Sequence, residues 1–592
     1  MNILKNRTFR DIGLFLPLAL CYFAGLPTSL PDFDAGEFAL LAMKGGIAHP
    51  PGYPLLTLVL RSVVMIFQKL VPLIPLLACV SIFFTVAAAI ITHKIARAYT
   101  GNETASLFGV YLIFLTGIIW RSATAIEPFA LNLFLSAFCL YALYHALESN
   151  EDRQIKKWFM LTGLTFGLSF CNHHSMAFLL PSAILTWVFI TTSRLTALKW
   201  FSLGSLLGLL PLVSFFFNTA NPIYVWGDWN VPMERLLTHL LRHEYGTFTL
   251  FAGATGHFFN GIKHFFITLP ATFSFILIVP AIVGVFIPFF TQREEVCPVV
   301  QKNRFMIVVI TAFIFTGPVF LSFFNLPRTD WAYFMGERFF ALPILFLALP
   351  SAVFMAMLQN NLSKTILVLL MGVSLSLHIL NQWPAAERKS ATFYEAHIRN
   401  ILEIVEDNAV VVTTSDLDYY GLLYGIHLVK PEKKNVLIVQ EGLWHLDWYR
   451  KDNISQAFPD FDRYNLSIDH YFFLLLKKRP VYLIRTPKKD EPNAKFLPLS
   501  YPVGPFIKLV SSQDLLLPAL KLFQLNEHLL LNKMELPTAF TREKGNLWEQ
   551  SMLTYYLRTW DYLAAIMSDK GHSKLEEACK KYGQLYQTGS LD

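Results

Sequence analysis

Two acidic residues three positions apart, Asp34 and Glu37, are the part of this sequence best suited to chemistry. At the start of a helix, side chains three apart share one face, so both carboxylates can point at one spot. A carboxylate held there can act as a general base, removing the proton from a hydroxyl that then attacks a carbon. The same spacing fits a helix N-cap, with Asp34 as the cap and Glu37 closing a capping box, and both interpretations can hold together.

A rigid segment follows the two acids. His49 opens the run His-Pro-Pro-Gly-Tyr-Pro, and proline both fixes φ and keeps the residue before it out of the helical region. The segment is therefore predicted to be a stiff turn that gives the next helix a set direction. His49 is a candidate for contact with a substrate, and a hydrogen-bonded structural histidine is the alternative.

The composition decides which solvent surrounds these residues. Of the 592 residues, 54% are hydrophobic and only 15% are charged, which is typical of membrane proteins. The net charge of +7 is spread over loops without a basic stripe, so nucleic acid is not an expected partner. The six cysteines are scattered without a C-x-x-C pattern, which predicts neither a disulfide framework nor a metal site.

Positive charges predict how the chain crosses the membrane. Basic residues precede the first apolar run, which places the N-terminus in the cytoplasm. For the next basic cluster, at Lys94, to face the cytoplasm as well, one of the three apolar stretches before it must not cross. The stretch 53–70 carries Arg61 and Lys69, and a charge at mid-membrane costs about 2.5 to 3.5 kcal/mol. We therefore predict a helix that lies in the outer interface.

The other apolar runs then cross the bilayer about eleven times. The predicted crossings lie near residues 12–29, 76–92, 105–121, 129–147, 158–171, 176–192, 200–217, 264–290, 305–324, 339–357 and 364–381. This pattern predicts an α-helical polytopic membrane domain over residues 1–381, with a first outer loop at about 30–75. Asp34, Glu37, Lys44 and His49 belong in that loop, because burying all four together in hydrocarbon would cost on the order of 10 kcal/mol.

The sequence changes character at about residue 382. Charge rises, and short β-rich runs occur at 409–415, 435–441, 481–486 and 506–512, with helical segments between and after them. Residues 382–592 are therefore predicted to form a soluble α/β and helical domain outside the cytoplasm. No internal repeat of 20 to 50 residues is found, which argues against a solenoid.

Several motifs in the membrane part resemble one known family. They are D-A-G-E (34–37), G-I-A-H-P-P-G-Y-P-L (46–55), I-E-P-F-A-L-N (126–132), G-L-S-F-C-N-H (167–173), W-G-D-W (226–229) with H-E-Y-G-T-F (243–248), and G-E-R-F-F (336–340). In this order they resemble the transmembrane O-mannosyltransferase-like family, a former domain of unknown function within the C-type (GT-C) glycosyltransferase superfamily.

The resemblance implies a specific activity. C-type enzymes span the membrane many times, take a sugar from a polyprenyl or dolichyl phosphate on the outer face, and use an acidic residue in the first outer loop, which maps onto Asp34. The resemblance implies an inverting transfer of a mannose-like hexose to a hydroxyl of protein Ser/Thr, a glycan or a lipid. Related protein O-mannosyltransferases have adjacent Asp and Glu, whereas here the acids are three apart, so the resemblance does not assign the role of Glu37. We expect a multi-pass protein of a bacterial inner membrane whose active site faces outward.

Other outer-face residues are candidates for binding the substrates. The arginines Arg61 and Arg338, or Arg328, are predicted to hold the donor phosphate, because guanidinium grips phosphate bidentately. The alternatives are an arginine that reaches lipid headgroups or one paired with Glu337. The remaining candidates, for sugar or acceptor contact, are Glu127, Asn132, Asn172 and His173, with Trp226 and Trp229 for stacking on sugar or anchoring at the interface.

Other functions are compatible with parts of the sequence. A transporter or lipid flippase needs only many crossings with some polar residues, but paired halves with interrupted helices are not found. A non-enzymatic scaffold with a partner-binding tail is a third option. Asp32 and Asp34 form a D-x-D pattern typical of metal-bound nucleotide-sugar enzymes, which use a soluble α/β domain instead. No cofactor is expected, since His173 and His174 lack a third ligand at metal-like spacing.

Overall fold

A computed structural model of the chain describes residues 7–31, 33–217, 223–247, 257–290, 299–359, 362–389, 391–459, 464–484, 492–535 and 547–588. The chain forms two compact units. Unit 1 comprises Met1–Pro27 and Leu41–Lys389, and unit 2 comprises Thr28–Leu40 and Ser390–Asp592. The segment with Asp34 and Glu37 therefore belongs to the same unit as the carboxy-terminal part. Asp32, and with it the D-x-D pattern, lies outside the described residues.

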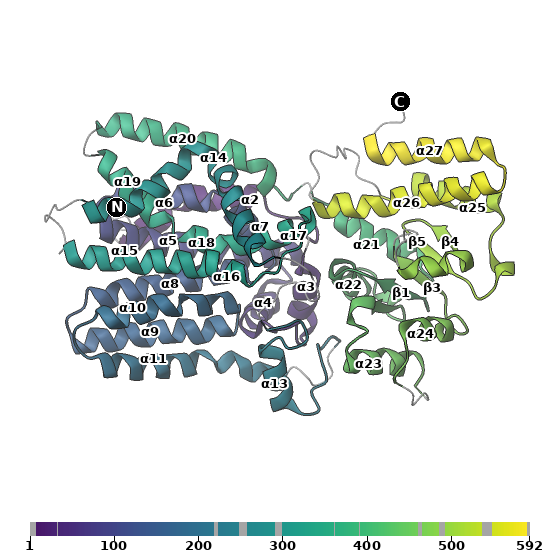
Figure 1. The fold of residues 1–592 in the computed structure, drawn as a ribbon, viewed down its shortest axis with the longest axis horizontal. Coiled ribbons are helices and arrows are strands. Elements are labelled where there is room, and N and C mark those ends of the chain that lie inside the picture. Colours follow the sequence, from purple (N-terminus) through teal and green to yellow (C-terminus); the bar gives the residue numbers. More distant parts are fainter. Residues whose placement is uncertain are drawn as a thin grey trace. The chain divides into compact units, whose positions relative to one another are not determined.

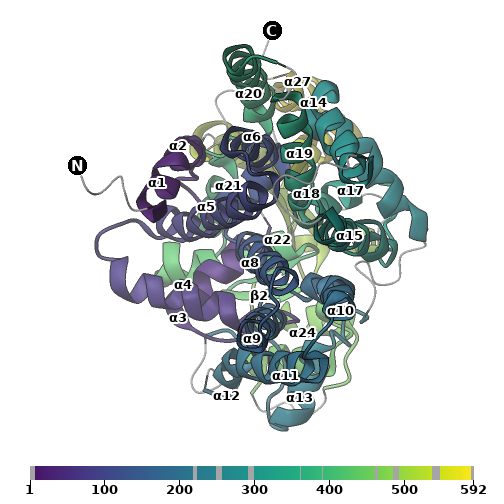
Figure 2. The same ribbon diagram turned by 90° about the vertical axis from the view of Figure 1, so that its left-hand side faces the viewer.

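Unit 1 is a bundle of helices, which Figure 1 shows from the side and Figure 2 from one end. Its helices are α1 (Arg7–Leu14), α2 (Leu16–Ala24), α4 (Pro54–Phe67), α5 (Leu73–Thr100), α6 (Glu103–Phe114), α7 (Gly117–Thr124), α8 (Phe129–Leu147), α9 (Asp152–Phe170), α10 (Leu180–Phe189), α11 (Arg194–Gly208), α12 (Ser214–Phe217), α13 (Pro232–Leu240), α14 (Phe258–Phe290), α15 (Val299–Ile314), α16 (Phe320–Ser322), α17 (Asp330–Glu337), α18 (Ala341–Leu345), α19 (Ala348–Gln359) and α20 (Lys364–Ala386). Helix α3 (Ala35–Lys44) begins in unit 2 and ends in unit 1.

Several of these helices are long and apolar enough to cross a bilayer. Among the described residues they are Leu73–Thr100, Phe129–Leu147, Arg194–Phe217, Lys302–Ser322 and Thr365–Ala386, and up to eight crossings result if each of three bent helix pairs counts as one. The chain is thus an integral, multi-pass membrane protein. The predicted count of eleven also includes 12–29, 158–171 and 176–192, whose helices are too short or too charged to qualify alone, so that count stays a prediction.

The predicted non-crossing segment forms a short apolar helix, α4. It has 14 residues, which at 1.5 Å per residue gives about 21 Å, less than the roughly 30 Å of a hydrocarbon core. Apolar side chains at its end, Met65 and Ile66, are 72% and 67% exposed within the chain. Both observations agree with a helix lying in the interface, which stays a prediction.

Helices α9 and α11 pack at very short range because both carry small residues four apart. Gly163 and Gly167 on α9 face Gly204 and Gly208 on α11. A Cβ at Gly163 would lie 2.0 Å from the Phe201 carbonyl oxygen, so only glycine fits there. In hydrocarbon, where apolar burial provides no driving force, such close backbone packing is what holds two helices together.

This packing predicts a loss of stability for Gly204→Ala. The added Cβ would lie 2.2 Å from the backbone oxygen of Met160, so α9 and α11 must separate, at a cost of about 1 to 3 kcal/mol. The matched control is Gly372→Ala on α20, where nothing lies within 4 Å of the added Cβ. Thermal unfolding in detergent should show a lower midpoint for Gly204→Ala alone. An unchanged midpoint would contradict the packing argument.

Unit 2 contains a five-stranded mixed sheet in the order β2-β1-β3-β5-β4. The strands are β1 (Val410–Thr413), β2 (Leu437–Gln440), β3 (Val481–Ile484), β4 (Ser500–Val503) and β5 (Phe506–Leu509). The helices are α21 (Phe393–Ile404), α22 (Asp416–Tyr424), α23 (Asp447–Ala457), α24 (Ile468–Leu475), α25 (Ala519–Glu527), α26 (Leu547–Asp569) and α27 (Ser573–Thr588). Strands β2, β1 and β3 are parallel, whereas β5 and β4 run antiparallel.

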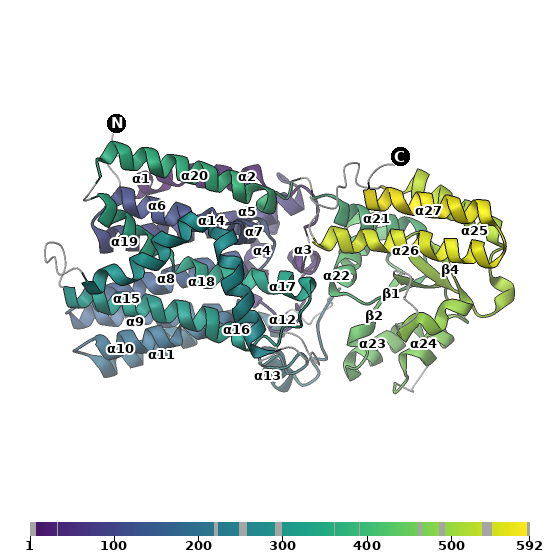
Figure 3. The same ribbon diagram turned by 45° about the horizontal axis from the view of Figure 1, so that its top comes forward.

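Helices cover both sides of this sheet. Figures 1 and 3 show α23 and α24 on one side and α25, α26 and α27 on the other. The central strands β1 and β3 are buried along their whole length, which explains their continuous apolar sequences, since a strand covered on both faces needs no polar alternation. Helix α22 begins three residues after the carboxyl end of β1, and its N-terminus is capped by the Ser415 side chain, which accepts from the Asp418 N–H.

Candidate active site

The two predicted catalytic acids lie at the start of α3. The helix begins at Ala35, so Asp34 is its N-cap residue, and the Asp34 carbonyl oxygen accepts a hydrogen bond from the Phe38 N–H at 3.1 Å. Asp34 is partly exposed, whereas Glu37 is only 1% exposed. Asp34 is therefore the acid of the two that a substrate can reach, and Glu37 is held inside unit 2.

Glu37 contributes to the electrostatics of a buried tyrosine cluster in unit 2. Burial raises the pKa of Tyr419 well above its ordinary value, and the neighbouring Tyr449, Asp452 and Glu37 act in the same direction. Tyr419 therefore keeps its proton throughout the physiological range and can only donate it in a hydrogen bond.

The His-Pro-Pro-Gly segment of unit 1 is held by a short parallel bridge. Ile47 pairs with Val225, the Trp226 N–H donates to the Ile47 carbonyl at 3.0 Å, and the Ile47 N–H donates to the Tyr224 carbonyl at 3.3 Å. This bridge joins two of the motifs that sequence analysis identified 180 residues apart. The prediction of a stiff turn gains a physical cause, because backbone hydrogen bonds hold Ile47 before the turn and Leu55 after it, the latter donating to the Cys171 carbonyl at 2.8 Å.

A buried ion pair, which the sequence analysis did not predict, fastens this region. Arg235 donates from Nη1 and Nη2 to the two carboxylate oxygens of Glu244 at 2.6 and 3.0 Å, and the Trp226 indole N–H donates to Glu244 at 2.7 Å. Gly227 has φ +96°, and a Cβ there would lie 2.2 Å from the Arg235 guanidinium. Trp226 is 1% exposed, so its indole packs inside the unit and does not offer a face to sugar.

His239, next to this ion pair, predicts a dependence of stability on pH. Burial, followed by the charge of Arg235, holds the pKa of His239 well below its usual value. Below about pH 6.5 the unfolded chain takes up a proton at His239 that the folded chain does not. Lowering the pH therefore reduces the free energy of unfolding by up to about 1.36 kcal/mol per pH unit. Unfolding midpoints at pH 7.5 and 5.5 should differ less in His239→Gln than in wild type. An equal difference would contradict this assignment.

Candidate binding residues from three parts of unit 1 are joined by one continuous line of contacts. The Tyr53 hydroxyl lies 3.3 Å from Nε2 of His49, and the Tyr53 ring stacks on the ring of His173. Nδ1 of His173 lies 2.8 Å from the Ser175 hydroxyl, which accepts from Nδ2 of Asn132 at 2.9 Å. His49 and His173 are partly exposed, whereas Asn132 is buried. The structure thus brings His49, His173 and Asn132 together, with the two imidazoles accessible.

Asn172 has a buried position in the same region. Its Nδ2 donates to the Pro128 carbonyl at 3.0 Å, and its side chain is fully buried. Its Oδ1 and that of Asn132 have no hydrogen-bond partner among the described residues. Both amides thus hold neighbouring segments in position, and direct contact with sugar stays a prediction.

Glu127 and Arg338 form an ion pair with each other. Nη1 of Arg338 lies 3.3 Å from Oε1 of Glu127, which is 3% exposed. The alternative partner, Glu337, is instead bound by Arg121 at 2.9 Å and lies 3.2 Å from His264. The sequence suggested Glu337 because it is adjacent in the chain, but neighbours on a helix point in different directions.

Two further guanidinium groups, those of Arg61 and Arg242, have no carboxylate partner among the described residues, and Arg242 lies near His173. Nη1 of Arg61 and Nε of Arg242 are buried and have no hydrogen-bond partner there. Desolvation lowers the pKa of His173 well below its usual value, and nearby His174, Arg242 and Arg338 add to the effect. The surroundings of His173 are therefore cationic.

Arg242 was not predicted; its signal in the sequence is a lone cation beside the H-E-Y-G motif. Arg328 is exposed.

The described part of the chain holds no group of three or more His, Cys, Asp or Glu side chains arranged to bind a metal ion. His173 and His174 are adjacent, but Nδ1 of His173 is used by Ser175. Arginines and aromatic rings surround them, and the arginines suit an anion.

Residues 34–197 match the family described as the protein O-mannosyl-transferase TMEM260 N-terminal domain. This stretch of the chain is similar to that family. The match begins at Asp34 and includes the motifs up to Asn172 and His173, so it confirms the resemblance that the motifs indicated.

Two curated relatives match a longer part of the chain, and both are described as protein O-mannosyl-transferase TMEM260. The mouse protein is 24% identical over 466 residues, covering 74% of this chain and 63% of its own length. The Dictyostelium discoideum protein is 23% identical over 513 residues, covering 78% of this chain and 60% of its own length. The chain thus spans about three fifths of the length of the curated relatives that it matches.

Solved structures share the fold. The crystal structure of ArnT from Cupriavidus metallidurans bound to undecaprenyl phosphate has a TM-score of 0.52 and 12% identity, covering 85% of this chain and 98% of ArnT. The apo structure of the same protein has a TM-score of 0.51 and covers 87% of this chain and 100% of ArnT. The chain therefore shares the fold of ArnT.

Proposed function

We propose that this protein is an inverting glycosyltransferase that moves a mannose-like hexose from a polyprenyl or dolichyl phosphate to an acceptor hydroxyl. The observation that carries this proposal is the cationic surrounding of His173, to which Arg242 contributes without a carboxylate partner among the described residues. Such groups need an anion when the site is filled, because a buried unpaired charge is costly. The match to O-mannosyl-transferases supplies the class of reaction.

In the proposed mechanism, Asp34 accepts the proton of the acceptor hydroxyl as its oxygen attacks the anomeric carbon. The bond from that carbon to the lipid-phosphate oxygen breaks, and the phosphate leaves with the bonding pair. Guanidinium groups neutralise this leaving group and bind it bidentately. Arg242 and Arg61 are the residues proposed for that task, whereas Arg338 shares its charge with Glu127.

The roles of the other predicted residues follow from their exposure. Glu37 is buried, so we assign it to holding the start of α3, and with it Asp34, in place. His49 and His173 are accessible and can hydrogen-bond sugar hydroxyls. Serine or threonine of a protein is the proposed acceptor, after the relatives' name, and glycan or lipid is the alternative. The proposed location is a bacterial inner membrane, with this site outside the cytoplasm.

The test uses the full-length protein in nanodiscs with radiolabelled mannosyl-phosphoryl polyprenol and a peptide rich in serine and threonine. We expect label to become covalently attached to the peptide with inverted anomeric configuration and free polyprenyl phosphate to appear in equal amount. The protein is also placed in proteoliposomes, where movement of the lipid across the bilayer is measured. Movement of the intact lipid across the bilayer without covalent product would overturn the proposal in favour of a transporter or flippase.

Arg242→Gln should raise the KM for the lipid-phosphate donor about 10- to 100-fold, with a smaller change for the peptide. A charge-assisted hydrogen bond contributes about 1.5 to 3 kcal/mol, and Gln cannot neutralise the phosphate. The control is Arg153→Gln at the start of α9, where the side chain is exposed. Steady-state kinetics against the donor measure the effect. An unchanged donor KM would exclude Arg242 from the phosphate site.

A further inference from the structure

We propose that helices α21 and α22 of unit 2 position the catalytic turn at Asp34, with Glu395 and Gly36 as the positioning residues. This inference rests on the proposed function of Asp34 as the base. It gives the carboxy-terminal part of the chain a task in the reaction, since the segment Thr28–Leu40 folds with Ser390–Asp592. Its evidence comes entirely from contacts within unit 2.

Hydrogen bonds fix the chain just before the catalytic turn. The backbone N–H of Leu30 donates to Oε2 of Glu395 at 2.7 Å, and the Ser29 hydroxyl donates to the Ala391 carbonyl at 3.2 Å. Leu30 is fully buried and Ser29 is 9% exposed. Residues more than 360 positions apart in sequence are thus joined at two successive places.

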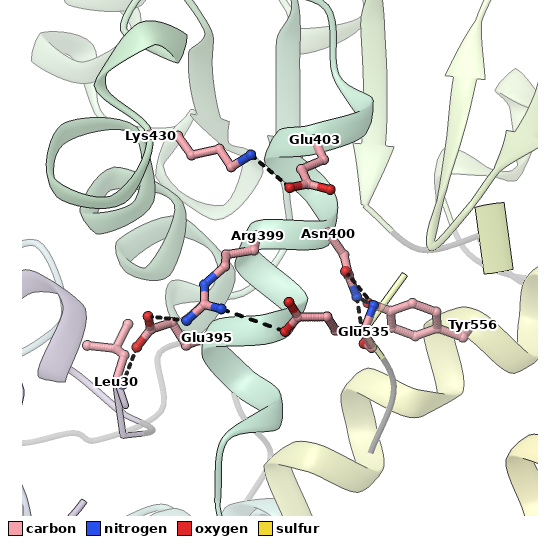
Figure 4. A network of polar contacts seen from close by, with 8 residues as sticks. All are labelled: Leu30, Glu395, Arg399, Asn400, Glu403, Lys430, Glu535 and Tyr556. Carbon is pink, nitrogen blue, oxygen red and sulfur yellow. Dashed lines mark hydrogen bonds and ion pairs between the residues drawn. The ribbon is translucent and has the colours of Figure 1, made fainter. Parts of the chain in front are cut away.

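Glu395 is itself held in place by a network that Figure 4 shows. Its Oε1 accepts from Nη2 of Arg399 at 2.8 Å, and Nη1 of Arg399 lies 3.6 Å from Glu535. The backbone of Glu535 exchanges two hydrogen bonds with the Asn400 side chain, at 2.9 and 3.0 Å. Asn400 also donates to the Tyr556 hydroxyl of α26 at 3.2 Å. One carboxylate therefore connects the Leu30 amide to two helices of unit 2.

Gly36 fixes the turn on its other side. A Cβ at Gly36 would lie 2.7 Å from the Tyr420 carbonyl oxygen, 2.9 Å from its carbon and 3.2 Å from the Gly421 nitrogen. All three atoms belong to the backbone of α22, which cannot rotate away as a side chain could. Helix α22 is in turn tied to α21, because the Tyr394 hydroxyl donates to the Leu417 carbonyl at 2.7 Å. The start of α3 thus lies directly on α22.

The direction of the Asp34 carboxylate follows from these contacts. Asp34 is the N-cap of α3 and lies two residues before Gly36 and four after Leu30. A shift of the α3 start by about 1 Å displaces the carboxylate by a similar amount, and misplacement on that scale can cost about 10²-fold in rate. Donor binding should be affected less, because the arginines proposed to bind the phosphate belong to unit 1.

The first test is Gly36→Ala in the full-length protein. We expect kcat to fall about 10- to 100-fold while the KM for mannosyl-phosphoryl polyprenol changes less than about twofold. Gly372→Ala is the matched control, since its Cβ meets nothing within 4 Å. A normal kcat in Gly36→Ala, or an equal loss of donor binding, would overturn the proposal.

The second test compares two variants of Glu395. Glu395→Gln keeps an oxygen that can accept the Leu30 N–H, so kcat should fall only a few-fold, whereas Glu395→Leu should fall as far as Gly36→Ala. Hydrogen exchange of the peptide containing Leu30 is read in both, because it does not depend on activity. Faster exchange in Glu395→Leu alone is the expected result, and equal exchange would overturn the positioning role. A wild-type protein without transfer activity would instead refute the proposed function.

Discussion

Asp34→Asn should lower the rate of sugar transfer by about 10²- to 10⁴-fold, the usual contribution of a general base. Asparagine has the size of aspartate but cannot accept the hydroxyl proton. It is also as good an N-cap as aspartate, so α3 should begin at the same residue and keep its stability. The substitution therefore separates the two interpretations of Asp34, as base and as helix cap, which a change to alanine would combine.

The measurement is label transfer from mannosyl-phosphoryl polyprenol to peptide, with thermal unfolding of each variant in parallel. Asp34→Ala should lose the rate and also about 1 kcal/mol of stability, because the cap is lost. Asp569→Asn, an exposed acid at the end of α26, is the control and should behave as wild type. Normal transfer by Asp34→Asn would remove this residue as the base, whatever its value as a cap.

Local sequence patterns predicted most of the elements because each depends on near neighbours. The β-rich runs at 409–415 and 435–441 contain β1 and β2, and apolar runs contain the long helices. Strand β4 was missed because it contains Pro502, which removes a ladder donor. The sheet order explains why Pro502 is tolerated: β4 pairs only with β5 and forms the edge of the sheet.

The site was predictable only in part, because its residues come from distant parts of the chain. The motifs identified His49 and His173, which the structure joins through Tyr53. Contact between Leu30 and Glu395 has no signal in a single sequence, since neither residue forms a local pattern with the other. The partner of Arg338 was also out of reach, because ion pairs are set by the directions of side chains in the folded chain.

The close packing of α9 against α11 has a local signal in the sequence. The spacing of Gly163 with Gly167, and of Gly204 with Gly208, is the small-xxx-small pattern of helices that pack closely in membranes. The structure places these two pairs against each other. Arg242 lies close to Glu244 in the sequence. The local sequence, however, does not distinguish an arginine that faces a site from one that faces solvent.

Glu244→Gln should destabilise the fold by about 3 to 5 kcal/mol, the usual cost of removing one partner from a buried ion pair. The side chains of Arg235 and Glu244 are 8% and 9% exposed, so water cannot replace the lost carboxylate. Glutamine keeps the volume and can still accept from the Trp226 indole, but it places an N–H against the guanidinium. The Trp226 segment also holds the His-Pro-Pro-Gly turn through Ile47, so transfer activity should fall together with stability.

Thermal and denaturant unfolding in detergent measure this effect, and two further variants identify its cause. Glu234→Gln lies beside Arg235 on α13 but is exposed, so it should unfold like wild type. Replacing both charges, as in Arg235→Met with Glu244→Leu, removes the stranded guanidinium and should regain part of the loss. If the double variant were as unstable as the sum of its single changes, the two residues would act independently, and the ion pair would not be what fastens the turn.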